Sequence, residues 1–163
     1  MYEFAKLIHL AAAIVWMGGM TFMLYALRPA AMATLQPPMR AELMVQVWKR
    51  FFAMVLACIV LLFLTGSHMY TAVFRATKVA VASGTLLPNT ALVPLGWNIM
   101  LALGMLMFLL FGHIYFAGFR KFKRAVAAAD WPAAAKSAGQ IQMLVTVNFV
   151  LGWLAIIAVH LAR

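Results

Sequence analysis

Residues 51–74 read FFAMVLACIVLLFLTGSHMYTAVF, a run without a single Asp, Glu, Lys or Arg. A helix of about 20 apolar residues is long enough to cross the hydrocarbon core of a bilayer. Three further uncharged runs reach that length, at residues 7–27, 91–119 and 141–162. The sequence therefore predicts four membrane-spanning helices.

The overall composition agrees with this interpretation. Of 163 residues, 67% are hydrophobic and only 10% are charged, whereas a soluble domain is about 45–50% apolar and about 25% charged. So few charges cannot cover a globule in water. Short connections between consecutive spans favour an up-down-up-down four-helix bundle. We expect an all-α integral membrane protein with a single transmembrane domain over residues 1–163.

The basic residues between the spans predict an orientation. The first and third connections carry most of them, and cytoplasmic loops carry the excess of Lys and Arg. Both termini are therefore expected outside, in the periplasm of a bacterial inner membrane. The net charge of +10 does not indicate nucleic-acid binding, because the basic residues do not cluster among aromatic residues on a polar face. On the inner side we place Arg28, Arg40, Lys49, Arg50, Arg120, Lys121, Lys123, Arg124 and Lys136, and on the outer side Lys6, Arg75, Lys78 and Arg163.

Proline and capping residues mark the ends of the spans. The Pro37–Pro38 pair interrupts the first connection, after which Met39–Arg50 is typical of a helical lead-in to the second span. Asp130 precedes Trp131 and a proline, a pattern that starts a helix near Trp131. The weakly polar Ala76–Thr90 is expected to be the external turn.

Four histidines fall one to a span, at His9, His68, His113 and His160. Alternating helix directions place His9, His68 and His160 near the outer face. His113 then lies near the cytoplasmic face, roughly 20 Å from His9 in depth at 1.5 Å rise per residue. Polar groups inside a bilayer are expensive, so each of them needs a partner.

Imidazoles on facing helices are what a b-type haem requires, since two neutral ring nitrogens bind the iron axially. We take His9 as one ligand and His68 as the preferred second, with His160 as the third candidate. Gly66 leaves room near His68, and Thr65 or Ser67 is expected to orient the His68 ring. Four basic residues on the same face are expected to neutralise the haem propionates: Lys6, Arg75, Lys78 and Arg163.

Two polar residues are given secondary roles. His113 has no histidine at its own level, so packing or contact with a quinone is favoured over axial ligation. Asn148 lies one turn before Gly152 on the same helix face, where small residues let helices approach closely in lipid. We expect Asn148 to form an interhelical hydrogen bond.

Methionines suggest a different metal. Met17, Met20 and Met23 recur every third residue of the first span, and thioethers are soft ligands suited to Cu(I). Methionine is also a common apolar filler, and packing is the favoured interpretation of these three. No membrane carboxylate, Ser-His-Asp set or phosphate-binding loop is found, which leaves a membrane oxidoreductase as the class of enzyme to consider.

Several segments carry a resemblance to a known family. The segments are Lys6–His9, Val15–Gly19, Leu27–Ala30, Gly112–Phe116, Arg124–Val126, Asp130–Pro132, and Asn148 with Gly152. Through them the chain resembles the copper-resistance protein D (CopD)-like membrane proteins, which implies a helical membrane protein associated with copper uptake or tolerance. It is also similar to small membrane b-type cytochromes, in which a histidine early in the first span is a haem ligand, and His9 has that place. The long periplasmic copper-binding portions of a full-length importer are missing.

Three functions follow from these observations. The first is a membrane protein with haem b near the outer face that transfers electrons between a membrane quinone and a periplasmic redox partner. The second is a copper transporter or copper-tolerance protein. The third is a non-catalytic assembly subunit of a larger complex. The oligomeric state is left open.

Overall fold

A computed structural model describes residues 1–161, which form four long helices and contain no β-strand. All four are long and apolar enough to cross a membrane, as the sequence predicts. Two of them contain a π-helical turn in their second half, where one extra residue widens the helix. The helices are Tyr2–Thr34, made of α1 (Tyr2–Phe22), η1 (Met23–Leu27) and α2 (Arg28–Thr34); α3 (Pro37–Ala82); Leu95–Ala127, made of α4 (Leu95–His113), η2 (Ile114–Phe119) and α5 (Arg120–Ala127); and α6 (Trp131–Leu161).

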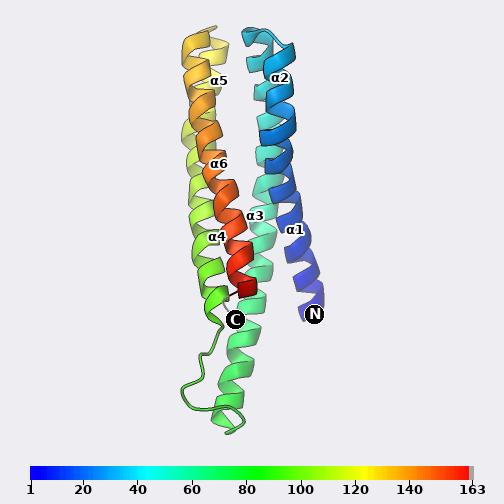
Figure 1. Ribbon diagram of the computed structural model, residues 1–163, viewed down its shortest axis with the longest axis vertical. Helices are drawn as coiled ribbons and strands as arrows, with labels where there is room; N and C mark the ends of the chain where they lie inside the picture. The colour runs from blue at the N-terminus through cyan, green and yellow to red at the C-terminus, as the bar shows by residue number, and fades with distance from the viewer. Residues whose placement is uncertain (162–163) are drawn as a thin grey trace.

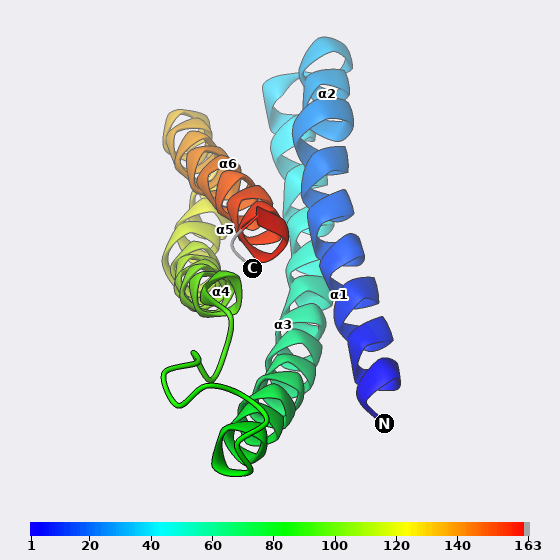
Figure 2. The same ribbon diagram turned by 60° about the horizontal axis from the view of Figure 1, so that its bottom comes forward.

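The helices associate as two pairs. The first pair is α1 with α3, and the second is α4 with α6 (Figures 1 and 2). The start of α1 and the end of α6 lie towards the same end of the molecule, where the last part of α3 and the loop after it extend further (Figure 1). We call this the histidine end, after His9 and His160. At the other end lie α2, α5 and the starts of α3 and α6 (Figure 1). We call this the arginine end, after Arg28 and Arg40.

One predicted connection is shorter than expected. The turn predicted at Ala76–Thr90 is helical as far as Ala82, and the third long helix begins only at Leu95 rather than at Ala91. Arg75 and Lys78 are exposed there and do not interrupt the helix, whereas Gly84 and Pro94 mark where the chain leaves and resumes helical structure. The fourth predicted span ends at Ala162, which lies outside the described residues.

The predicted helix start at Trp131 is confirmed, and Met39–Arg50 is helical as expected, but the Pro37–Pro38 pair lies in the first turn of α3 rather than in the connection. Helix α3 begins at Pro37, and α6 begins at Trp131. The Asp130 carboxylate caps α6 by accepting a hydrogen bond of 3.0 Å from the Ala133 amide, the usual partner of an N-cap side chain.

Two turns close with the same backbone motif. After α3, the Thr85 amide donates to the Ala80 carbonyl at 2.9 Å and the Gly84 amide to Val81 at 3.1 Å. After α5, the Asp130 amide donates to the Ala125 carbonyl and the Ala129 amide donates to the Val126 carbonyl. These are Schellman motifs, which need a left-handed residue after the helix. Gly84 takes that place in the first turn with φ of 75°, and Ala129 in the second with φ of 51°.

Two groups of side chains join the helix pairs. Towards the arginine end, the Trp48 ring lies 4.7 Å from that of Phe122, and the Phe52 ring lies 5.2 Å from that of Phe119. Nearer the histidine end, Trp16 of α1 stacks on Phe108 of α4 with ring centroids 6.0 Å apart. These aromatic contacts join α1 and α3 to α4, η2 and α5, and α6 also contacts both α1 and α3.

The outward faces of all four helices are apolar. Leu7, Leu64, Leu109 and Trp153 are at least half exposed, one on each long helix. Contiguous exposed apolar surface on this scale is not found on soluble monomers.

Candidate functional site

His9 is the most constrained of the four histidines. Its ring is half-buried between α1 and α3, and its Nδ1 lies 2.9 Å from the Thr65 hydroxyl oxygen. Because this bond connects residues 56 positions apart in the chain, it fixes both the position of the ring and the alignment of α1 against α3.

The Thr65 hydroxyl determines which nitrogen of His9 carries the proton. Thr65 donates its only hydroxyl proton to the Leu61 carbonyl, at 2.6 Å. Its oxygen therefore accepts from His9, so Nδ1 carries a proton, and in the neutral ring Nε2 keeps the lone pair. A neutral imidazole held in this tautomer by a second group is the usual state of a metal-ligating histidine.

This arrangement corrects one expectation. Thr65 was expected to orient His68, but the structure pairs it with His9. The reason lies in helix geometry, because Thr65 faces α1 while His68, three residues later, is exposed. Thr65 therefore orients a candidate ligand, as expected, but that ligand is His9 and not His68.

Gly66 allows the His9 ring to approach α3 closely. A Cβ atom placed on Gly66 would lie 3.2 Å from Cε1 and 3.6 Å from Nδ1 of His9. The first distance is shorter than an ordinary carbon–carbon contact of about 3.5–4.0 Å. The room expected near this glycine exists, and the His9 ring occupies it.

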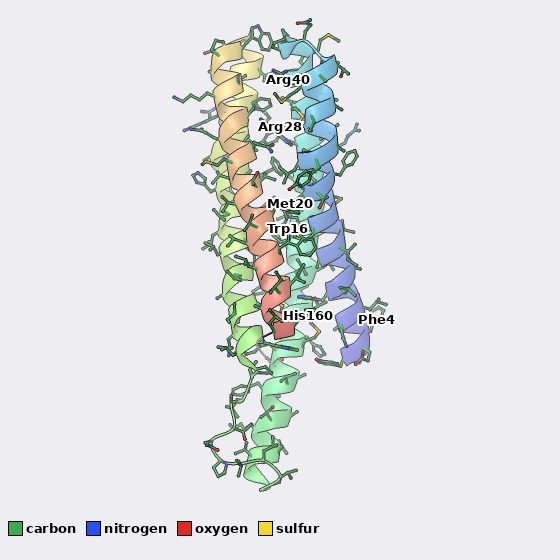
Figure 3. The ribbon with its side chains drawn as sticks, in the orientation of Figure 1. Phe4, Trp16, Met20, Arg28, Arg40 and His160 are labelled. Carbon is green, nitrogen blue, oxygen red and sulfur yellow. The ribbon has the colours of Figure 1, made fainter. Side chains whose placement is uncertain are left out.

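The other candidate ligands are less constrained. His68 and His113 are exposed. His160 is also exposed and donates from Nδ1 to the Ile156 carbonyl of its own helix at 2.8 Å. Figure 3 places His160 at the same level as Phe4 near the start of α1. His68 follows Thr65 by three residues, about 4.5 Å further along α3, so His9, His68 and His160 all belong to the histidine end.

These histidines do not gather at one point. Within residues 1–161, no group of three or more His, Cys, Asp or Glu side chains is arranged to hold a metal ion. The three histidines therefore lie towards the same end of the helices, but they do not form a preassembled metal site. Of the candidate ligands in the described part of the chain, only His9 has its ring held by a side chain of another helix, through Nδ1.

Basic residues near the histidine end are exposed. Lys6 forms a weak ion pair of 3.9 Å with Glu3, while Arg75 and Lys78 lie on the surface of α3. Arg163, the fourth residue expected to neutralise propionates, lies outside the described residues.

The methionines of the first helix pack in the protein interior. Met20 and Met23 are buried in the core cluster. The Met17 thioether lies over Gly152 of α6, in the space that a Cβ atom at that position would need, and Met107 of α4 packs against the same glycine. This contact gives Met17 and Gly152 a defined role in packing the two helix pairs together.

Asn148 does not form the expected interhelical bond through its carbonyl oxygen. The residue is 2% exposed, and its Oδ1 has no hydrogen-bond partner within residues 1–161. An unsatisfied buried polar atom of this kind costs stability.

Two features were not predicted from the sequence. The pairing of His9 with Thr65 requires the alignment of α1 with α3, which hydropathy does not contain. A cavity of about 240 Å³ at the arginine end is lined by residues of α2, α3, α5 and α6. The only sign of this cavity in the sequence was that Arg28 and Arg40 lie near the ends of apolar runs. The positive-inside rule already explains arginines at such positions.

No protein-family model matches this sequence, and no curated protein or solved structure is significantly similar to it.

Proposed function

We propose that the chain is an integral membrane protein of the bacterial inner membrane, folded as an up-down-up-down bundle with both termini outside. Support comes from the four long apolar helices and their exposed apolar faces. The sequence has nine Lys and Arg residues in the segments at the arginine end, beside only Glu42 and Asp130. The positive-inside rule then orients this end towards the cytoplasm.

Within this bundle, we propose that His9 is an axial ligand of a b-type haem near the outer face, with electron transfer as the function. The observation that carries the proposal is the bond from His9 Nδ1 to Thr65. It directs the proton of the neutral ring to Nδ1, which leaves Nε2 for the iron, and it holds the ring so that little entropy is lost on ligation.

A haem bound at this end would supply a one-electron redox centre, accessible to a quinone in the lipid and to a soluble partner outside. The protein's own part is to hold the imidazole. Thr65 accepts a hydrogen bond from Nδ1–H, and Gly66 lets the ring pack against α3. His68 is our preferred second ligand, because it follows Thr65 by one helical turn and is free of any bond to its own backbone through the ring. His160, by contrast, is bonded to Ile156.

Copper handling remains the alternative, with His9 and the methionines as ligands. The packing of Met17 against Gly152 explains that residue without a metal, so the structure adds nothing in favour of this alternative. The third candidate function, a non-catalytic assembly subunit, predicts neither haem nor copper.

One composition measurement distinguishes these functions. The full chain, purified from membranes of cells supplied with iron, haem precursor and copper, is assayed for haem by pyridine haemochrome and for both metals by mass spectrometry. We expect haem and iron in a fixed ratio to protein, without copper. Stoichiometric copper would favour the alternative, and the absence of both, even after added haemin, would overturn the haem proposal.

A further inference from the structure

A cavity at the arginine end lies between the two helix pairs. It has a volume of about 240 Å³ and is lined from one pair by α2 and α3, and from the other by α5 and α6. Trp48 and Phe122, both buried, form an aromatic wall. Opposite lie the small residues Ala138 and Gly139 of α6. Most of the lining is therefore apolar.

Two arginines supply the polar part of the lining. Arg28 and Arg40 are both half-buried at this cavity, and Figure 3 shows them at the arginine end between the helix pairs. Within residues 1–161 the ion pair between Lys6 and Glu3 is the only one, so neither guanidinium is neutralised by a carboxylate. The acidic residues of this end, Glu42 and Asp130, are exposed, and Asp130 is used in capping α6.

The backbone adds to the positive potential. Pro37 and Trp131, the first residues of α3 and α6, both line the cavity. The N-terminus of a helix carries a partial positive charge of roughly half a unit. The α6 terminus is already capped by the Asp130 carboxylate, so the start of α3 and the two unpaired guanidinium groups supply the positive potential at this apolar-walled space.

The π-helical turns help to place these groups. Segment η1 ends at Leu27, directly before Arg28, and η2 ends at Phe119, shortly before Phe122. A π-helical turn adds a residue and so changes the face on which the following side chains lie. Such turns are rare and often occur at functional sites, which agrees with a binding role for the residues that follow them.

We infer that this cavity binds a phosphate group on an amphiphilic molecule, with Arg28 and Arg40 holding the phosphate oxygens and the aromatic wall contacting an apolar portion. Guanidinium groups bind phosphate through paired, charge-assisted hydrogen bonds. Basic pockets between membrane helices on the cytoplasmic side bind the head groups of anionic lipids. The same chemistry also suits a soluble phosphate ester. This site is independent of the haem proposal, since it lies at the opposite end of the helices.

The test measures thermal unfolding of the delipidated full chain in a neutral detergent. Phosphatidylglycerol, phosphatidylcholine and sodium phosphate are added separately, with ionic strength held constant. We expect phosphatidylglycerol to raise the unfolding temperature and phosphatidylcholine to have little effect. The double variant Arg28→Gln/Arg40→Gln should bind phosphatidylglycerol about tenfold more weakly or worse, because two charge-assisted contacts are lost.

Two further variants make the result specific. Lys121→Gln/Lys136→Gln removes the same number of charges from exposed positions at this end and should respond like the wild type. Gly139→Leu keeps both arginines and puts a side chain where a Cβ atom meets no neighbour within 4 Å. It should fold and yet lose the response, which keeps the test valid if the arginine variant does not fold.

Each outcome decides the inference. A response to sodium phosphate alone, lost in the same variants, supports the site and identifies a soluble phosphate compound as its ligand. Equal responses to the two lipids, or the same loss in the lysine control as in the arginine variant, would overturn it. So would the absence of any response to all three additions.

Discussion

The Nδ1 atom of His9 lies 2.9 Å from the hydroxyl oxygen of Thr65, which donates its own proton to the Leu61 carbonyl. This chain of two hydrogen bonds crosses from α1 to α3 and ends on a backbone carbonyl, which can only accept. The direction of both bonds is therefore determined, and with it the tautomer of His9.

Replacing Thr65 by Val should affect both stability and ligation. The change keeps the shape but removes the acceptor, so the free energy of unfolding should fall by about 1 kcal/mol. Haem affinity should fall by about 10- to 100-fold, as for other groups that orient a ligand. Haem titration and thermal unfolding measure the two effects, and Thr65→Ser should restore both. Thr71→Val, whose hydroxyl bonds only carbonyls of its own helix, is the control; an equal loss of affinity there would contradict the assignment.

Gly66 and Gly104 form a matched pair for the close approach of His9. Alanine is favoured over glycine in a helix by about 1 kcal/mol, and a Cβ atom at Gly104 meets no neighbour within 4 Å. Gly104→Ala should therefore leave stability unchanged or raise it. Gly66→Ala should lower it and displace the His9 ring, because the new methyl group would lie 3.2 Å from Cε1. Calorimetry that finds both variants equally stable would show that the ring does not pack as described.

Asn148→Leu should stabilise the protein. The leucine is of similar size and removes a buried Oδ1 that has no partner within residues 1–161, a defect that costs about 1–3 kcal/mol. Thr146→Val, at an exposed position where the hydroxyl bonds its own helix, should change stability by less than about 0.5 kcal/mol. Unfolding in detergent compares the two. A clear destabilisation by leucine would mean that the amide has a partner in the membrane-embedded protein.

The two Schellman turns predict opposite effects of exchanging alanine and glycine. Ala129 is left-handed with φ of 51°, which costs about 1–2 kcal/mol for a residue with a Cβ atom. Ala129→Gly should therefore raise the unfolding temperature, and Gly84→Ala should lower it. Two changes of the same sign would be inconsistent with the described turns.

The sequence predicts the helices well because the signal is strong and local. The uncharged run at residues 51–74 requires a spanning helix wherever it folds, and the cap at Asp130 is formed by neighbours in the chain. The prediction of a turn over Ala76–Thr90 was wrong for its first part, because weak polarity alone does not end a helix and α3 continues to Ala82. The helix ends only just before Gly84, whose left-handed conformation lets the following amides donate hydrogen bonds to the last carbonyls of α3.

The site was predicted less completely, for a physical reason. Histidine depth follows from helix rise, so the shared end of His9 and His160 was accessible to sequence reasoning. The rotation of α3 about its own axis could not be predicted from the sequence. This rotation decides that Thr65 faces His9 while His68 is exposed. The lack of a partner for the Asn148 Oδ1 within residues 1–161 likewise depends on how α6 is rotated against its neighbours, which the sequence does not contain.

The most direct test of the central claim is the absorption spectrum of the purified protein in the His9→Ala and His113→Ala variants, each supplied with haemin. His113 is exposed and belongs to a different helix pair, so it controls for loss of a histidine as such. We predict a Soret band and a reduced α-band in the wild type and in His113→Ala, with both bands lost or strongly shifted in His9→Ala. An unchanged spectrum in His9→Ala, or no Soret band in the wild type, would contradict the assignment of His9 as a haem ligand.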